Sequence, residues 1–301
     1  MLQRDGFIEE IYKALATDKD IYFLSADFGA AALDDLRIKY KDNFIHCGIS
    51  EQNMIDVAVG LALEGKKVFC YAMAPFISLR ALEQIKTGPG IMNLPITLIS
   101  VGVGIGYADS GPTHYVTEEF ACLRSIVGAS IYTASDTQTA RELARKLLAE
   151  PCFAYVRLDR HLLPNISFGI EKDGFRLNGD LNQNSIVLIS HGKSTHVCKD
   201  LYDLHPEKYV LIDLIQSKPF PPDLPPLLNR VKGVIVVDEQ TPSGSLGAAV
   251  FEACSAANIF PRIINVTLPE MYFFENIGRE GIFRKYGLTL ENIEIQSARF
   301  N

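Results

Sequence analysis

The chain has few features of a nucleic-acid-binding or secreted protein. Lysine and arginine together number 29 against 36 aspartate and glutamate residues, the net charge is −7, and the sequence contains no basic block. Nucleic acid attracts the opposite excess of charge, so we expect no nucleic-acid partner. The N-terminal segment has acidic residues within its first ten positions and no continuous apolar run. We therefore expect no secretory signal and a cytoplasmic protein.

Cysteine is scarce and shows no paired spacing. The six cysteines are isolated, mostly within apolar stretches, and no C-x-x-C occurs; they are Cys47, Cys70, Cys122, Cys152, Cys198 and Cys254. We expect reduced thiols in the core. Apolar residues make up 48% of the 301 residues and charged residues 22%, so the whole chain is expected to fold. This length suits two domains of about 150 residues each.

Long apolar runs are also rare, with one stretch to examine. Residues 87–108 carry no charge over 22 positions, a length that could span a bilayer. The same stretch contains five glycines, two prolines and Asn93. A turn, a buried strand and a glycine-rich loop fit it better than a membrane helix.

Short β-rich runs alternate with helical patterns along the chain. In the first half we expect strands at 21–25, 44–47, 67–71, 96–101, 130–133 and 153–157, and helices near 4–16, 29–39, 51–64, 76–86, 117–126 and 136–149. Later strands are expected at 185–190, 209–214, 233–238 and 262–266, with helices between them. This rhythm predicts an α/β fold of two domains, each a mostly parallel sheet covered by helices.

The pattern lapses before residue 185, which predicts a domain boundary. We expect a first domain at 1–164, a connection at 165–184 and a smaller second domain at 185–301. Asp173-Gly174 and Asn178-Gly179 within the connection are hairpin or turn signals.

Residues 48–54, Gly-Ile-Ser-Glu-Gln-Asn-Met, follow a predicted strand. Gly48 permits a sharp turn, Ser50 is a good N-cap, and Glu51 falls in the first turn of the next helix. Ligands of open α/β sheets bind at this carboxyl rim. An acid in a first helical turn also complements the helix dipole, worth about 0.3–1 kcal/mol. The physics alone therefore leaves open whether Glu51 has a function.

The seven residues resemble the G-I-[AS]-E-[QH]-N-M motif of the transketolase family of thiamine diphosphate enzymes. In that family the glutamate contacts N1′ of the cofactor's aminopyrimidine ring and favours the tautomer that accepts the proton of thiazolium C2. The resemblance assigns this catalytic and cofactor-binding role to Glu51.

Other positions match the family in the same domain. Phe76 resembles an aromatic residue placed against the cofactor pyrimidine, with Met73 and Leu79 at flanking cofactor positions; apolar residues at helical spacing also suit simple core packing. Gly111-Pro112-Thr113-His114 resembles the D-G-P-T-H segment. By this resemblance His114 binds substrate hydroxyls and is a candidate proton carrier.

Some positions depart from the family or match it more loosely. Ser110 replaces the aspartate before Gly-Pro-Thr-His, and Asp109 is the neighbouring substitute. A histidine near the sugar phosphate falls at Gly102 and is absent. Arg157 and Arg160 resemble the arginine region that receives an anionic group, or are surface arginines. Asp27, in Phe-Leu-Ser-Ala-Asp-Phe-Gly, matches a position after the first strand that organises a turn, the cofactor region or a subunit contact.

The second domain resembles the family's C-terminal domain through residues 234–250 and through Tyr-Gly-Leu-Thr at 286–289. The Gly-Asp-Gly segment that helps hold Mg²⁺ and the diphosphate does not occur in the chain. The resemblance therefore implies the C-terminal subunit of a split transketolase, with no metal ligands of its own. A separate N-terminal subunit would supply the Mg²⁺ and diphosphate contacts in a heterotetramer. The implied reaction moves a two-carbon ketol unit from a ketose to an aldose, as free sugars or sugar phosphates.

Three alternatives stay open at this point. The chain could be a beta-type subunit of a 2-oxoacid dehydrogenase, although that motif lacks Gln-Asn-Met and Gly-Pro-Thr-His. It could belong to an enzyme that decarboxylates a 2-oxoacid and passes the acyl group to a sugar. It could also be a non-catalytic regulatory homologue.

Overall fold

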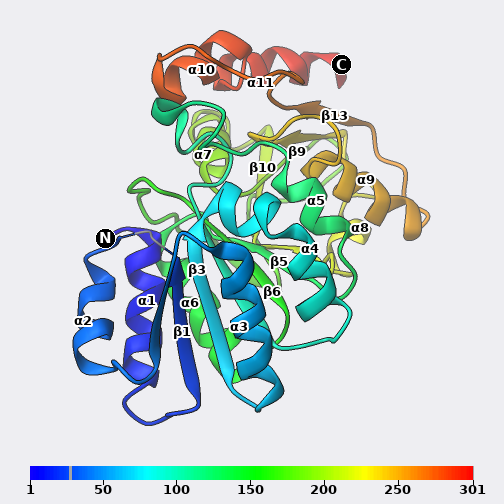
Figure 1. Ribbon diagram of the computed structural model, residues 1–301. Coiled ribbons are helices and arrows are strands. Elements are labelled where there is room, and N and C mark those ends of the chain that lie inside the picture. Colours follow the sequence, from blue (N-terminus) through cyan, green and yellow to red (C-terminus); the bar gives the residue numbers. More distant parts are fainter. Residues whose placement is uncertain (27–28, 301) are drawn as a thin grey trace.

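The computed structural model describes residues 1–26 and 29–300. Two sheets, each covered by helices, form its two halves (Figure 1). The first half occupies the lower part of that view, and the C-terminal helices α10 (Gly278–Tyr286) and α11 (Leu290–Ser297) lie at the top. Asp27 lies outside the described residues, so its predicted role is untested.

The first sheet has seven strands in the order β11-β5-β6-β4-β3-β1-β2. Its strands are β1 (Ile21–Ala26), β2 (Phe44–Gly48), β3 (Lys67–Met73), β4 (Ile96–Val101), β5 (Ser130–Thr133), β6 (Ala154–Leu158) and β11 (Gln216–Lys218). All neighbours pair in parallel except β11, which runs antiparallel to β5. The mostly parallel sheet predicted for this half is confirmed.

Helices bury both faces of the first sheet. Along β3, Val68 and Cys70 join the core on one face, whereas Phe69 and Tyr71 join the core on the other. The helices of the first face are α3 (Glu51–Leu63), α4 (Leu82–Ile85) and α5 (Glu119–Ser125), and those of the second are α1 (Gln3–Ala14), α2 (Ala32–Lys39) and α6 (Thr137–Ala149). Continuous apolar strands suit this double burial, since side chains on both faces leave water.

The helix predicted over 76–86 is wrong in its regularity. Phe76–Arg80 and Lys86–Gly90 form π-helical turns on either side of the four-residue α4. Pro89 has no amide hydrogen to donate, and a Cβ on Gly88 would lie 2.4 Å from Val59 Cγ2, so the second turn packs tightly on α3. Short π-helical turns of this kind are frequent at functional sites.

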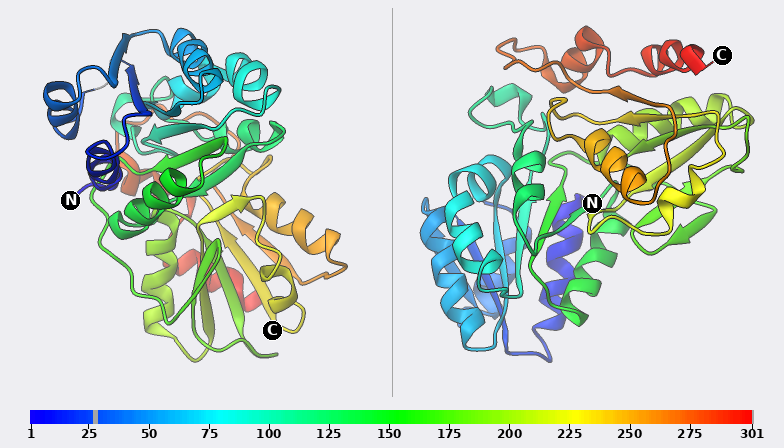
Figure 2. Two further views of the ribbon diagram at one scale, coloured as in Figure 1. Left: turned by 90° about the horizontal axis from the view of Figure 1, so that it is seen from below. Right: turned by 90° about the vertical axis from the view of Figure 1, so that its right-hand side faces the viewer.

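The second sheet has the order β13-β12-β9-β10-β8-β7. Its strands are β7 (Ile170–Lys172), β8 (Phe175–Asn178), β9 (Ile186–Ser190), β10 (Tyr209–Leu214), β12 (Gly233–Val237) and β13 (Ile263–Val266). Helices α7 (Lys193–Leu204), α10 and α11 pack on one face, and α8 (Leu224–Leu227) and α9 (Leu246–Ala256) on the other. Figure 2 shows these layers from two further sides.

The segment expected as a connection is itself structured. β7 and β8 form a hairpin that closes at Asp173-Gly174, where Gly174 has a φ of +86°, and β8 pairs antiparallel with β10. The turn signal at Asp173-Gly174 is confirmed. The unpredicted β11 pairs with β5, so each sheet contains chain from beyond the predicted boundary. The exact domain limits stay a prediction.

Buried ion pairs also join the two halves. Arg279 of α10 donates to Asp159 at 2.6 Å, just after β6, and to Glu239 at 3.0 Å, just after β12. The amide of Ile105 donates to the same Glu239 carboxylate at 3.3 Å. Charged groups this deep require partners, and these partners fix the second half against the loop after β4. Within the described ranges, no helix is both long and apolar enough to cross a membrane.

Candidate functional site

Glu51 is buried at the carboxyl rim of the first sheet. Gly48 ends β2 with a φ of +69°, a conformation that favours glycine, and the chain turns into α3. Ser50 is the N-cap residue, but its hydroxyl donates to the Cys47 carbonyl at 2.5 Å and accepts no helix N–H. Glu51 is only 3% exposed although it opens the helix. A carboxylate hidden from water needs a partner, and the helix dipole supplies part of one.

The other part comes from Arg80, which the sequence did not single out. Its Nη1 donates to Glu51 Oε2 at 2.7 Å. Its guanidinium carbon lies 4.0 Å from the centroid of the Phe76 ring, within the same π-helical turn. The Arg80 side chain itself is 41% exposed. A flat cation therefore lies over the carboxylate and against the aromatic ring, with one side toward solvent.

His114 completes the group from another loop. The loop follows β4 and the short 3₁₀ turn Ala108–Ser110. The His114 and Phe76 ring centroids are 5.6 Å apart with an interplanar angle of 71°. His114 Nδ1 and Thr113 Oγ1 are 2.8 Å apart, and among the described residues Nε2 has no hydrogen-bond partner. The structure thus brings Glu51, Phe76 and His114 together and leaves one imidazole nitrogen available.

Asp109 and Arg160, two predicted substrate residues, pair with each other. Arg160 Nη1 and Nη2 donate to the two Asp109 carboxylate oxygens at 2.6 and 3.0 Å. The guanidinium also lies 4.3 Å from the Tyr107 ring centroid. The hydrogen bond from Arg160 lowers the pKa of Asp109 below its ordinary value. Ser110 lies exposed at the end of the same turn.

Arg157 lies in the interior, away from this surface pair. It is 1% exposed, and its Nε donates to Glu119 Oε1 at 2.8 Å. Its Nη1 contacts Thr133 Oγ1 and His191 Nε2, each at 3.0 Å, and His191 in turn contacts Asp238. Arg157 therefore links the two sheets in this structure, which gives no support to its predicted contact with substrate.

Met73 and Leu79 are partly buried and pack among core residues. Met73 lies against the core of the second sheet, and Leu79 against Ala74, Val103 and Val116. These contacts match the packing interpretation of the two residues. Their flanking role beside a cofactor stays a prediction.

Gly102 explains why the family's phosphate-side histidine is missing. It has a φ of +82°, and a Cβ there would lie 2.0 Å from Tyr107 Cε2. The Tyr107 ring, on which Arg160 stacks, fills the space that a side chain at position 102 would need. The predicted anion end of the site is thus occupied by an aromatic ring and a closed ion pair.

Glu51 and Phe76 fit an aminopyrimidine ring. Glu51 offers a carboxylate oxygen to a planar N–H donor, and Phe76 offers an aromatic face at stacking distance from that donor. A flat heterocycle requires the same two elements, an acceptor at its edge and an apolar surface against its face. Between residues 1 and 300, positions 27 and 28 apart, no group of three or more His, Cys, Asp or Glu side chains is placed to hold a metal ion.

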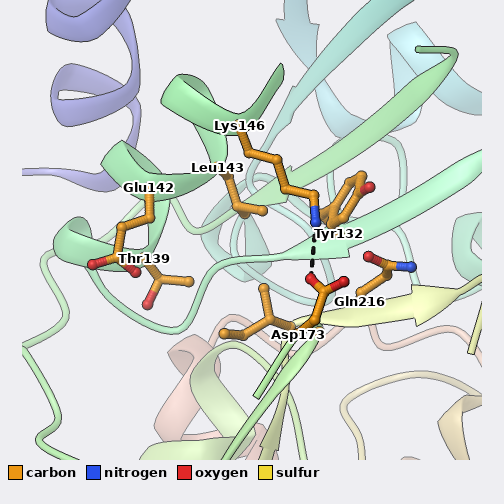
Figure 3. Close-up of a pocket in the computed structure, with 9 residues that line it drawn as sticks. Tyr132, Thr139, Glu142, Leu143, Lys146, Asp173 and Gln216 are labelled. Atoms are coloured by element: carbon orange, nitrogen blue, oxygen red, sulfur yellow. Dashed lines mark hydrogen bonds and ion pairs between the residues drawn. The ribbon is translucent and has the colours of Figure 1, made fainter. Parts of the chain in front are cut away.

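A separate cavity lies at the opposite side of the first sheet. Figure 3 shows this space of about 160 Å³ between α6, β5, β11 and the β7–β8 turn, with the Lys146–Asp173 ion pair of 2.9 Å across it. β2, which leads to Glu51, is one edge of the sheet, and β11 is the other. The cavity therefore does not belong to the Glu51 site.

The doubly covered sheets and the ligand site at a carboxyl rim define an α/β protein of the doubly wound class. The family profile described as "Transketolase, pyrimidine binding domain" matches residues 2–165. This is more than half of the chain, which therefore belongs to the transketolase family.

Similar proteins agree over nearly the full length. The chain is 29% identical over 300 residues to one subunit of the apulose-4-phosphate transketolase of Phocaeicola vulgatus, covering 96% of this chain and 94% of that protein. It is 26% identical to 1-deoxy-D-xylulose-5-phosphate synthase of Corynebacterium diphtheriae, covering 96% of this chain but 47% of the synthase. A solved structure titled "Split gene transketolase, inactive beta4 tetramer" has a TM-score of 0.85 at 22% identity, covering 97% of this chain and 96% of the other. The two-domain α/β fold is thereby confirmed.

Proposed function

We propose that this chain is the C-terminal subunit of a transketolase-like enzyme. The enzyme transfers a two-carbon ketol unit from a ketose to an aldose with thiamine diphosphate. The observation that supports this most directly is the convergence of Glu51, Phe76 and His114, from separate segments, at one rim of the first sheet.

Each side chain has a distinct task in this proposal. Glu51 accepts a hydrogen bond from the aminopyrimidine ring, and Phe76 supports the face of that ring. His114 contacts the substrate through Nε2, where a neutral imidazole can donate or accept a proton. Bound thiamine diphosphate supplies the carbon nucleophile and electron sink needed to cleave a carbon–carbon bond.

The proposal includes a separate partner. An N-terminal subunit supplies the oxygen ligands of Mg²⁺ and the contacts to the diphosphate, since Mg²⁺ prefers hard oxygen ligands. Two copies of each chain form a heterotetramer. The relative named as a transketolase subunit and the split-gene neighbour named as an inactive tetramer support this arrangement. We expect no turnover from this chain alone.

A second candidate function is thiamine-dependent acyl transfer from a 2-oxoacid. It is favoured by similarity to the deoxyxylulose-phosphate synthase and by the Asp109–Arg160 pair, which occupies the expected phosphate-binding arginine. The two reactions differ in the donor. Product analysis with a ketose and with pyruvate as donors therefore separates them.

The test uses the chain assembled with its partner, thiamine diphosphate and Mg²⁺. We expect Glu51→Gln to reduce turnover by about 10²–10⁴-fold, because the amide cannot replace a carboxylate in proton transfer. Glu64→Gln, an exposed change at the other end of α3, is the matched control and should leave turnover unchanged. Equal turnover of both variants would remove Glu51 from the mechanism.

A further inference from the structure

Arg80 holds the position that the proposed cofactor ring requires. A ring that stacks on Phe76 while its edge reaches Glu51 must lie on the face of Phe76 from which that carboxylate is accessible. The Arg80 guanidinium already lies there, 2.7 Å from Glu51 Oε2 and 4.0 Å from the Phe76 ring centroid. It is planar, it donates N–H groups and it stacks on aromatic rings, so it makes the same two contacts.

We propose that Arg80 is a further residue of the cofactor site, which holds the place of the aminopyrimidine ring until thiamine diphosphate displaces it. This inference rests on the proposed function. Without cofactor, Arg80 neutralises the Glu51 carboxylate and covers Phe76. When the cofactor binds, the guanidinium turns away and the two surfaces receive the ring.

The exposures of the two partners favour movement of Arg80 over movement of Glu51. Arg80 is 41% exposed and stands at the end of its π-helical turn, whereas Glu51 is 3% exposed at the start of α3. Arginine has a long side chain whose head group regains hydration in solvent. A contact with one solvent-exposed partner is weak enough to be exchanged for a ligand.

The other neighbour of Phe76 leaves room for this exchange. His114 meets the Phe76 ring edge to face at 71° and is held by Thr113, so it does not compete for the Glu51 carboxylate. Displacing Arg80 therefore opens the ring position without disturbing the proposed substrate contact.

Calorimetric titration of thiamine diphosphate into the assembled complex with Mg²⁺ tests the proposal without relying on turnover. We expect Arg80→Ala to lower Kd by about fivefold, the equivalent of one ion pair of modest strength. Arg80→Lys keeps the charge but loses the flat stacking group, and its Kd should fall between the two. Arg230→Ala, at an exposed position of the second half, is the matched control and should leave Kd unchanged.

An unchanged or higher Kd for Arg80→Ala would overturn the proposal, because a competitor's removal cannot weaken binding. If the unmodified complex binds thiamine diphosphate and Glu51→Gln weakens that binding, such a result leaves the proposed function standing. Absence of binding to any variant would reject both. A structure of the loaded complex provides a second measurement. The Arg80 guanidinium should have left Glu51, and a retained hydrogen bond beside the bound ring would contradict the inference.

Discussion

Replacing Gly102 with alanine tests whether Tyr107 closes the predicted anion end of the site. Gly102 has a φ of +82°, so any L side chain there pays a conformational penalty of about 1–2 kcal/mol. Its Cβ would also lie 2.0 Å from Tyr107 Cε2, and the overpacked ring must shift at a further cost of about 1–3 kcal/mol.

Gly65 offers a matched control because only the first penalty applies there. It has a φ of +78°, and nothing lies within 4 Å of its added Cβ. Both alanines reduce the entropy of the unfolded chain equally, so that contribution cancels in the comparison. Urea unfolding followed by circular dichroism should find Gly102→Ala less stable than Gly65→Ala by about 1–3 kcal/mol. A second change, Tyr107→Ala, should recover part of the loss at position 102.

Equal destabilisation by the two alanines would refute the reasoning. Tyr107 would then not occupy the space over Gly102, and position 102 could accept a larger side chain. The absence of the family's histidine would need another cause.

Two further predictions concern charged groups. Asp109→Asn releases Arg160 from a bidentate ion pair, so in the assembled enzyme KM for phosphorylated sugars should fall about two- to fivefold relative to unphosphorylated ones; an unchanged ratio would contradict this role for Arg160. Glu10 of α1 has its pKa lowered from 4.5 to about 2, first by a hydrogen bond from Arg145 of α6 and also by Lys13 and Arg141. Because the folded-state pKa is lowered, the ionised carboxylate stabilises the fold above pH 4.5, and this contribution is lost as the pH falls from 4.5 toward 2. Urea midpoints over the acid range should therefore depend less on pH in Glu10→Gln than in the exposed control Glu142→Gln, and identical slopes would contradict the pairing.

The sequence predicted the strands of the first sheet closely because their apolar runs are continuous. Strands β4 and β5 have the predicted bounds, and β1, β2 and β6 differ from prediction by a single residue at one or both ends. β11 was missed because it is three residues long, polar and paired only at an edge. Such short edge strands carry no periodic signal of their own.

Within the site, local motifs predicted what long-range pairing then modified. Glu51 and His114 carry recognisable motifs, whereas Arg80 resembles any exposed arginine beside apolar residues. Its importance comes from a carboxylate 29 positions away in the chain, which no local pattern reveals. Arg157 failed in the opposite direction. It looked like the neighbour of Arg160, but it lies within β6, where both faces of the sheet are buried.

The contact between Glu51 and the cofactor ring is the central claim, and a structure of the assembled complex with thiamine diphosphate and Mg²⁺ measures it directly. A carboxylate oxygen of Glu51 should lie about 3 Å from N1′ of the aminopyrimidine, with the Phe76 ring against its face. A ring bound elsewhere, with Glu51 still beyond hydrogen-bonding distance, would contradict the account.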